Sequence, residues 1–365
     1  MPTIALTLPH HRYDIRIEPG ALAHLGDRAK QVVPHGRAAL FMDAAVAATH
    51  GQAATDSLTK AGYQVVAHQV PSGEVHKTLD TVRRLYDVLL DARLERKSPV
   101  IALGGGVVGD TVGFVAATYL RGVPFVQCPT TLLAMVDASV GGKVGVDVPQ
   151  GKNLIGAFHQ PSLVVIDTDT LSTLPPRELR CGLAECVKHG VIRDAALFDW
   201  IADHVDDIRR LDGDTLVELV ARNVQIKANV VMADEKETGE RAHLNFGHTF
   251  AHAIETTTGY GAGGSYQHGE AVALGMVAAT RLAVDIRRCP AAVLGALVEL
   301  LQKIGLPTRA EQLPATGKLM DAMLSDKKVA GGKVRLVLPD RLGAVSIVND
   351  APREAIVAAW DSLRL

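Results

Sequence analysis

Short apolar runs alternate with longer amphipathic stretches through the first half of the chain. Apolar runs of this length, bounded by polar residues, are typical of strands, and the stretches between them have helical spacing. Strands that alternate with helices predict βαβ units and a mostly parallel sheet that is covered on both faces. We interpret as strands 37–43, 63–70, 99–104 and 123–129, and as helices 80–94 and 109–120.

The second half of the chain has a different pattern. A Gly- and Pro-rich stretch at 148–178 contains one strand-like run, 163–167, and beyond it apolar residues recur mainly at helical spacing until a short β pair near 333–348. A chain of 365 residues is long enough for two domains. We therefore expect an α/β protein, with an N-terminal Rossmann-like, mostly parallel sheet domain over 1–168 and an α-helical domain over 169–365. The helical stretches are 177–192, 215–234, 247–258 and 268–286.

The composition argues against several classes of protein. The net charge is −2 and like charges form no long block, so neither nucleic acid nor a membrane surface is an expected partner. No apolar stretch reaches the ~18 residues of a membrane span, and the N-terminus lacks the pattern of a signal peptide. We therefore expect a cytoplasmic protein, and any anion site has to be built locally.

The segment GGGVVGD at 104–110 follows a predicted strand and precedes a predicted helix. Glycines in that place let the backbone approach a pyrophosphate, and the helix start offers unpaired N–H groups. The acidic residue that usually binds the ribose about 20 positions later is missing, since 117–136 contains no Asp or Glu. Asp43, at the end of an earlier strand, is a better candidate. The alternative is a tight turn without a ligand, and we favour the nucleotide.

Three residues from distant segments are candidate metal ligands: Glu185, His248 and His268. One carboxylate and two imidazoles can hold Zn²⁺ or Co²⁺ and leave positions open for a substrate. The chain has fourteen histidines, and a single histidine is more often structural, so spacing alone leaves both interpretations equal. No HExxH motif is present, which argues against a zincin protease.

Several basic residues and the amide of Asn153 lie beside glycine-rich turns or in apolar segments, where they are candidates for phosphate or carboxylate binding. Lys188 shares a helix face with Glu185, His252 with His248, and Arg241 with Glu237. Taken singly, each cation is more often a surface charge. The other candidates are Arg121, Lys143, Lys152, Asn153, Lys227 and the Lys327–Lys328 pair.

Taken together, these segments resemble the 3-dehydroquinate synthase family of sugar-phosphate cyclases. The resemblance runs from about residue 70 to about residue 340, and several long motifs in one order are more specific than any single glycine loop. The motifs are GGGVVGD, CPTTLLAMVDASVGGKVGVD, GKNLIGAFHQP, TLPPRELRCGLAECVKHG, ADEKETGERAHLNFGHTFAHAIE, HGEAVALGM and SDKKVAGGKVRLVLP.

The resemblance implies a phosphate-eliminating carbon–oxygen lyase of the shikimate pathway. Its substrate would be 3-deoxy-D-arabino-heptulosonate 7-phosphate, a sugar-acid phosphate, and its products 3-dehydroquinate and phosphate. NAD⁺ would oxidise the substrate transiently, phosphate would leave, hydride would return, and an aldol closure would form the ring. Zn²⁺ or Co²⁺ would be the metal, and the protein would be a homodimer.

The resemblance also implies a role for each matching residue. The metal ligands would be Glu185, His248 and His268. The NAD⁺ site would include Asp43, Glu74, Lys77, Gly105, Gly106, Val107, Val108, Gly109, Asp110, Thr130, Thr131, Asp137, Lys143, Lys152, Thr170, Leu171, Ser172 and Thr173. The substrate would be bound or acted on by Arg121, Lys143, Asn153, Lys188, Lys227, Glu237, Arg241, Asn245, His252 and either Lys327 or Lys328.

Three alternatives remain at this point. Another sugar-phosphate cyclase would need no carboxylate-binding pair, whereas this chain retains Lys227 and Arg241. An iron- or glycerol-type alcohol dehydrogenase would release NADH, and a non-catalytic relative would have lost site residues. In addition, the loop before His268 is longer than is usual in the family, and a displaced His268 would leave Glu270 to compete for the metal.

Overall fold

The computed structural model describes residues 2–259, 265–325, 329–330 and 333–365. The chain forms two compact units, of which the first comprises Met1–Leu179 and Leu211–Lys236, and the second Arg180–Arg210 and Glu237–Leu365. These units differ from the predicted division at residue 168. The main reason is helix α8 (Gly213–Ala233), which packs on strands β1 and β2 of the first unit although it follows the first helices of the second.

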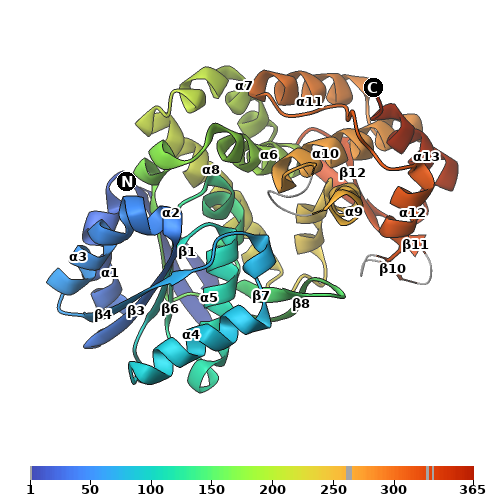
Figure 1. The fold of residues 1–365 in the computed structure, drawn as a ribbon. Helices are drawn as coiled ribbons and strands as arrows, with labels where there is room; N and C mark the ends of the chain where they lie inside the picture. Colours follow the sequence, from blue (N-terminus) through green and yellow to red (C-terminus); the bar gives the residue numbers. More distant parts are fainter. Residues whose placement is uncertain (1, 260–264, 326–328, 331–332) are drawn as a thin grey trace. The chain divides into compact units, whose positions relative to one another are not determined.

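A seven-stranded sheet, of which Figure 1 labels β1, β3, β4 and β6, forms the centre of the first unit, in the order β1-β2-β9-β6-β5-β3-β4. All neighbouring pairs are parallel except β1 and β2, so the predicted, mostly parallel α/β sheet is confirmed. The sequence patterns located five of these strands and missed the N-terminal pair. The bounds are β1 Thr3–Leu8, β2 His11–Glu18, β3 Arg37–Asp43, β4 Gln64–Val70, β5 Val100–Gly104, β6 Phe125–Pro129 and β9 Leu163–Asp167.

Helices cover both faces of this sheet. Along β3 the side chains alternate, so Phe41 joins a core with α4 and α5, while Leu40 joins a core with α1 and α3. Burial on both faces explains why the central strands are continuous apolar runs. The bounds are α1 Leu25–Val32, α2 Ala44–Val46, α3 Gln52–Lys60, α4 Leu79–Asp91 and α5 Gly106–Thr118.

A separate antiparallel hairpin, β7 (Lys143–Val148) and β8 (Gly151–Phe158), lies outside the main sheet. The only strand predicted in the Gly- and Pro-rich stretch 148–178 was 163–167, so β8 was missed. Most residues of β8 are half-buried or exposed, and an exposed strand with two glycines lacks the apolar alternation that marks a strand.

The second unit is mostly helical, as expected. Helix α10 forms its centre, since thirteen of its residues are buried. The predicted β pair is present as a hairpin, whereas α7, α11, α12 and α13 were not singled out from the sequence. The bounds are α6 Pro176–Arg193, α7 Ala195–Arg209, α9 His248–Thr258, α10 His268–Asp285, α11 Ala291–Ile304, α12 Thr316–Ser325, α13 Arg353–Ser362, β10 Val329–Ala330, β11 Lys333–Val334, β12 Leu336–Arg341 and β13 Ala344–Val348.

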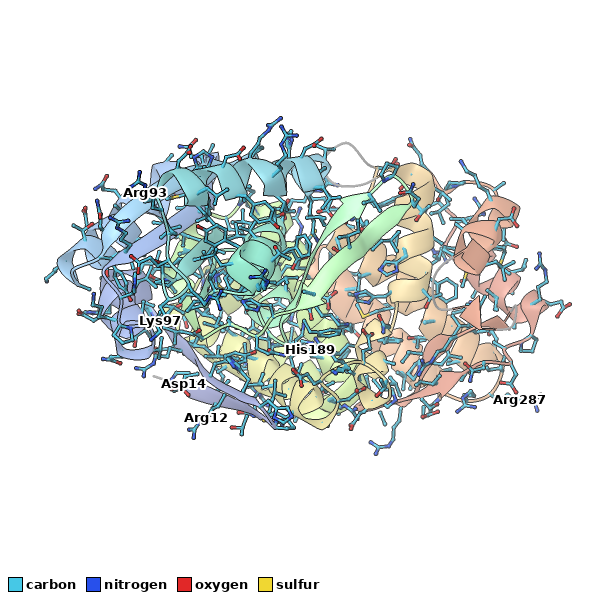
Figure 2. All side chains as sticks on the ribbon, turned by 90° about the horizontal axis from the view of Figure 1, so that it is seen from below. Arg12, Asp14, Arg93, Lys97, His189 and Arg287 are labelled. Carbon is cyan, nitrogen blue, oxygen red and sulfur yellow. The ribbon has the colours of Figure 1, made fainter. Side chains whose placement is uncertain are left out.

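Short turns of 3-10 or π helix connect these elements. They are η1 Ala21–His24, η2 Ala47–Gly51, η3 Glu74–His76, η4 Tyr119–Arg121, η5 Ala134–Ala138, η6 Thr168–Thr173 and η7 Glu240–Asn245. Charged side chains such as Arg93, Lys97 and Arg287 are exposed, whereas His189 of α6 is fully buried (Figure 2). Among the described residues, no helix is both long and apolar enough to cross a membrane.

Candidate metal centre and nucleotide site

The glycine-rich segment is the connection between β5 and α5. Strand β5 ends at Gly104, Gly105 is the N-cap, and α5 begins at Gly106. A Cβ on Gly105 would lie 3.1 Å from Thr131 Cγ2, and one on Gly104 would lie 2.8 Å from Val108. The first N–H groups of a helix have no partner within the helix and carry its positive end. Bare backbone and free donors at this place fit a pyrophosphate group.

Asp43 ends β3, the strand next to β5. Chain order reverses between these two strands, because β4 lies on the outer side of β3 and β5 on its inner side. Ligands of open α/β sheets bind at the carboxyl ends of strands at such a reversal. Asp43 Oδ1 accepts a hydrogen bond from the Val46 amide at 2.9 Å, so the carboxylate also caps α2.

The other predicted nucleotide residues follow neighbouring strands. Thr130 and Thr131 come directly after β6, and the stretch from Thr170 to Thr173 lies in η6 after β9. The Thr131 hydroxyl accepts a hydrogen bond from the Ala134 amide, and that of Thr173 lies 2.8 Å from His50 Nε2. The residues predicted to bind the nucleotide thus follow the carboxyl ends of neighbouring strands.

Lys77 is buried, and half-buried charged groups surround it. Its ammonium donates to Asp110 Oδ2 at 2.5 Å and to Asn153 Oδ1 at 2.6 Å, and the side chain is 4% exposed. Burial lowers the pKa of Lys77, but the carboxylates of Asp110 and Glu74 outweigh burial and raise it. Burial raises the pKa of Asp110, and Lys77 opposes that effect.

Lys152 and Glu74 extend this cluster. Lys152 Nζ lies 3.0 Å from Glu74 Oε1. Burial raises the pKa of Glu74, but the ammonium groups of Lys152 and Lys77 outweigh it and lower the pKa. Sequence analysis predicted these residues for NAD⁺ binding and Asn153 for the substrate phosphate. The structure brings them together, and their roles stay predictions.

Lys227 of α8 is nearly buried and pairs with Asp137 of η5. Its ammonium forms an ion pair with the Asp137 carboxylate and donates to the Asp137 carbonyl oxygen at 2.5 Å. Lys227 is 6% exposed, so it is not a solvated surface charge. The pair connects a residue predicted for the substrate with one predicted for NAD⁺.

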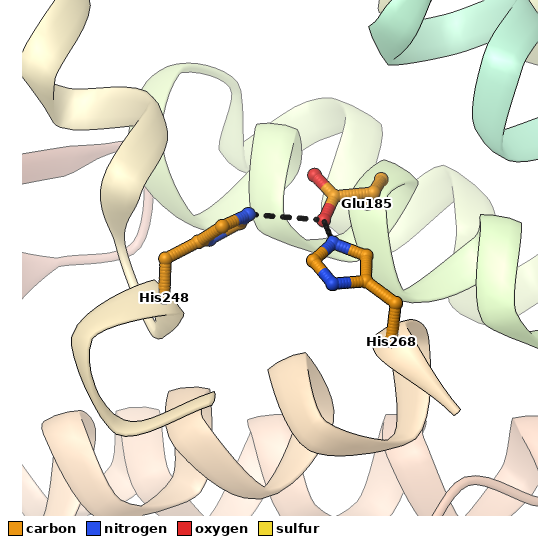
Figure 3. Close-up of side chains that lie close together, drawn as sticks. All are labelled: Glu185, His248 and His268. Carbon is orange, nitrogen blue, oxygen red and sulfur yellow. Dashed lines mark ion pairs between the residues drawn. The ribbon is translucent and has the colours of Figure 1, made fainter. Parts of the chain in front are cut away.

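Glu185, His248 and His268 lie together in the second unit (Figure 3). His248 begins α9, His268 begins α10, and Glu185 lies inside α6. Their ligand atoms are all within 4.8 Å of one another. Glu185 Oε1 lies 3.5 Å from His248 Nε2 and 3.7 Å from His268 Nε2. Two imidazole nitrogens and a carboxylate oxygen that face one point fit a Zn²⁺ or Co²⁺ ion.

The charges at this cluster are strongly coupled. Glu185 is fully buried and forms an ion pair with Lys188, which is 1% exposed. Burial, together with the Lys188 ammonium, holds the pKa of His248 well below its usual value, so that ring is neutral as a metal ligand must be. Burial also lowers the pKa of His268, but Glu255 and Glu185 outweigh it and raise the pKa to about 10.

Three glycines let the helices of this cluster approach one another. A Cβ on Gly275 of α10 would lie 2.1 Å from the Gly247 carbonyl oxygen, directly before His248. Gly247 itself has φ of +79°, a left-handed conformation that favours glycine. A Cβ on Gly269 would lie 2.3 Å from the Cys181 carbonyl oxygen of α6. The small residues thus place His248 and His268 on neighbouring helix starts.

The remaining predicted residues of the second unit lie on η7 and α9. Arg241 is 2% exposed, and Asn245 Nδ2 donates to Glu237 Oε1 at 2.7 Å. The rings of His248 and His252 are perpendicular, with centroids 5.8 Å apart. The roles of these residues stay predictions.

Two basic residues of the first unit, Arg121 and Lys143, are exposed. Lys327 and Lys328 lie outside the described residues.

Glu270, the alternative metal ligand, caps a helix instead. Its carboxylate accepts a hydrogen bond from the Gln267 amide at 2.9 Å and completes a capping box at the start of α10. His268, not Glu270, joins the metal cluster despite the longer preceding loop.

Sequence analysis missed Glu255 of α9. Its side chain is 3% exposed, and its Oε1 lies 3.2 Å from His268 Nδ1. The spacing contained a signal, since Glu255 follows His252 by three positions and His248 by seven, which places all three on one helix face.

Comparisons with known proteins agree on one family. Residues 67–181 match the profile of the 3-dehydroquinate synthase N-terminal domain, and residues 182–329 that of the C-terminal domain. The chain is 50% identical over 346 residues to the 3-dehydroquinate synthase of Microcystis aeruginosa, covering 94% of this chain and 93% of the relative. It is 48% identical over 363 residues to that of Acaryochloris marina, with 98% and 97% covered.

Solved structures of sugar-phosphate cyclases share the fold. A 2-epi-5-epi-valiolone synthase from Streptomyces hygroscopicus, with NAD⁺ and Zn²⁺ bound, is 30% identical with a TM-score of 0.88 over 98% of each chain. A 2-deoxy-scyllo-inosose synthase in complex with carbaglucose-6-phosphate, NAD⁺ and Co²⁺ is 24% identical with a TM-score of 0.89, again over 98% of each chain. A glycerol dehydrogenase from Schizosaccharomyces pombe is 18% identical with a TM-score of 0.67, covering 96% of this chain and 88% of its own.

Proposed function

This chain belongs to the 3-dehydroquinate synthase family, and from that premise we propose that it converts 3-deoxy-D-arabino-heptulosonate 7-phosphate to 3-dehydroquinate and phosphate with NAD⁺ and one Zn²⁺ or Co²⁺ ion. It is therefore an enzyme, a phosphate-eliminating lyase of the shikimate pathway. The observation that carries the proposal is the convergence of Glu185, His248 and His268 from three segments on one point.

These three residues hold the metal in our proposal. Bound there, the ion supplies Lewis-acid polarisation of a substrate hydroxyl. Glu185 contributes the one carboxylate among the three ligands, and Lys188 forms an ion pair with it in its buried place. The low pKa of His248 leaves the ring neutral near neutral pH. Its Nδ1 donates to the Phe246 carbonyl oxygen, so Nε2 keeps its lone pair for the metal.

We assign the nucleotide to the carboxyl edge of the sheet. NAD⁺ bound there would supply reversible hydride transfer. The backbone amides at the start of α5 bind the pyrophosphate, because Gly105 and Gly106 carry no Cβ that would block it. Asp43 binds the ribose hydroxyls, and Lys77 positions Asp110 of α5 through the ion pair between them.

The substrate has an anionic group at each end, and we assign cations and amides to both. Lys227 and Arg241 bind the carboxylate; each is nearly buried, so the charge that it offers is poorly screened by water. Asn153, Asn245 and His252 belong with the phosphate. Lys143, Arg121 and Lys328 complete the phosphate-binding set, and Glu237 orients Asn245 through the hydrogen bond between them.

The departing phosphate can itself remove the proton next to the transient ketone, so the chain needs no strong base. We assign His252 the role of a proton relay, since an imidazole can both donate and accept a proton. Confinement of the enol then favours closure of the ring. We further propose a cytoplasmic homodimer in which Arg121 acts on the partner's substrate.

The decisive experiment measures phosphate release from the heptulosonate 7-phosphate with catalytic NAD⁺, with and without EDTA, while NADH absorbance is followed. We expect release that depends on metal and no net NADH. Net accumulation of NADH would indicate an alcohol dehydrogenase. A protein that binds NAD⁺ and metal but releases phosphate only from sedoheptulose 7-phosphate would be a different cyclase.

A further inference from the structure

The Nδ1 atoms of the two imidazoles in the metal cluster have different hydrogen-bond partners. His248 Nδ1 lies 3.1 Å from the backbone carbonyl oxygen of Phe246, a neutral acceptor. His268 Nδ1 lies 3.2 Å from Glu255 Oε1, a carboxylate. In both rings the other nitrogen, Nε2, faces Glu185. One ring thus has an uncharged partner and the other an acidic one.

We propose that Glu255 is a positioning residue of the metal site: it binds the Nδ1 proton of His268 and thereby presents Nε2 to the ion. The inference rests on the metal site of the proposed function. A ring that donates through Nδ1 keeps its lone pair on Nε2. A carboxylate acceptor also makes that lone pair more basic than a carbonyl acceptor does, which strengthens the bond to a cation.

Burial supports this role over that of a simple surface ion pair. The Glu255 side chain is 3% exposed while that of His268 is 33% exposed, so the carboxylate lies behind the ring and away from solvent. Burying a carboxylate is costly unless charged or polar partners compensate. A solvated pair on the protein surface would not need that cost.

The geometry also argues against Glu255 as a metal ligand. Its carboxylate contacts the nitrogen of His268 that points away from the cluster, and Glu255 is not among the groups whose donor atoms converge there. The rotation of the His268 ring is therefore set from outside the cluster. Without Glu255 the ring would be free to turn or to carry its neutral proton on Nε2, which blocks coordination.

The test measures metal affinity rather than activity. Full-length enzyme is stripped with a chelator, and Zn²⁺ binding is measured by competition with a chromophoric chelator for the wild type, Glu255→Gln and Glu255→Ala. We expect Glu255→Ala to weaken Zn²⁺ binding by about ten- to a hundredfold. Glu255→Gln should lose less, since its amide oxygen still accepts the Nδ1 proton.

Glu270→Gln is the matched control. It makes the same chemical change two positions from His268, and glutamine preserves the capping box, so metal affinity should stay close to that of the wild type. Equal losses in Glu270→Gln and Glu255→Gln would overturn the proposal, because the start of α10 would then be sensitive to any change. Unchanged affinity in both Glu255 variants would overturn it as well.

The visible spectrum of the Co²⁺-loaded proteins separates positioning from ligation. Glu255→Gln saturated with Co²⁺ should show the same visible bands as the wild type, since the metal ligands are the same. Bands that signal a lost ligand would contradict the proposal. If Glu255→Ala fails to fold, the near-isosteric Gln variant decides. A wild type that binds no metal would refute the proposed metal site itself, a result distinct from failure of the role of Glu255.

Discussion

At the scale of single residues, buried charges account for most of the candidate chemistry. Lys77, Lys188 and Lys227 are each at most 6% exposed, and each has a carboxylate partner. A buried ammonium without a partner would lose its proton or destabilise the fold. These ion pairs therefore compensate the burial of three cations inside the protein.

Glu185→Ala should abolish metal binding and turnover while NAD⁺ binding remains. It should also destabilise the protein by about 3–5 kcal/mol, because Lys188 would be left as a buried charge without this partner. Metal content and urea unfolding measure the two effects. The double variant Glu185→Gln with Lys188→Met should recover stability but not metal; a variant that regained metal would refute Glu185 as a ligand.

The buried hydroxyl of Tyr63 should make the free energy of unfolding fall at alkaline pH. Its hydroxyl donates to the Val33 carbonyl oxygen at 2.6 Å, and burial raises its pKa from 10.0 to about 12. A raised pKa means that the folded state keeps a proton which the unfolded state loses. The contribution of Tyr63 to the free energy of unfolding is therefore complete below pH 10. It is lost as pH rises from about 10 to about 12, by about 1.4 kcal/mol per pH unit.

The comparison with Tyr63→Phe tests this dependence. At pH 8 the variant should be less stable by about 1 kcal/mol, the usual contribution of a hydrogen bond. Towards pH 11 the difference in unfolding free energy should shrink, because only the wild type has the hydroxyl to ionise. A difference that stays constant from pH 8 to pH 11 would show that Tyr63 does not titrate on unfolding.

At the scale of elements, the metal cluster depends on how closely α6, α9 and α10 pack. Two of the ligands begin their helices and the third lies inside α6. A shift of about 1 Å in one helix axis would therefore change the distances between the ligand atoms. The approaches are possible because Gly269 and Gly275 carry no side chain where the backbones of α6 and α9 pass.

Gly275→Ala should therefore weaken both stability and metal affinity, because its Cβ would lie 2.1 Å from the Gly247 carbonyl oxygen. Gly295→Ala is the control: it lies within α11, is exposed, and has nothing within 4 Å of its Cβ. The control should be neutral or more stable by up to about 1 kcal/mol. Comparable losses in both variants would refute the packing argument.

At the scale of the whole molecule, two ligands should stabilise two different units. The cluster of Glu185, His248 and His268 belongs to the second unit, whereas the glycine turn after β5 belongs to the first. A ligand that binds only the folded state stabilises it in proportion to the logarithm of its concentration over Kd. Metal and NAD⁺ should therefore protect different segments.

Hydrogen exchange on the full-length protein can measure this separation. Removal of metal with EDTA should increase exchange at the starts of α9 and α10, and NAD⁺ should decrease exchange at the start of α5. Readdition of Zn²⁺ should restore protection and raise Tm by an amount that grows with its concentration. Loss of protection confined to the β5–α5 turn after EDTA treatment would contradict the assignment of the metal to the second unit.

The sequence by itself determined which segments form most of the elements near the site. Strand 37–43 was predicted with its observed bounds, since a run of apolar residues buried on both faces is a local pattern. Helix α8 was predicted as a helix, but its membership of the first unit was not, because the partner of an apolar face is not a local property. The exposed strand β8 was missed because it buries too little to show a pattern.

The same distinction holds for the site. Residue types and the resemblance to a family selected Glu185, His248 and His268, yet only the tertiary structure brought their donor atoms within 4.8 Å of one another. It also placed Glu255 behind His268 and Glu270 in a helix cap. The periodicity of apolar residues reports which residues share a face over one or two turns of a helix. The distances between the ligand atoms depend instead on how three helices pack. That packing is decided by backbone contacts at glycines far apart in the chain.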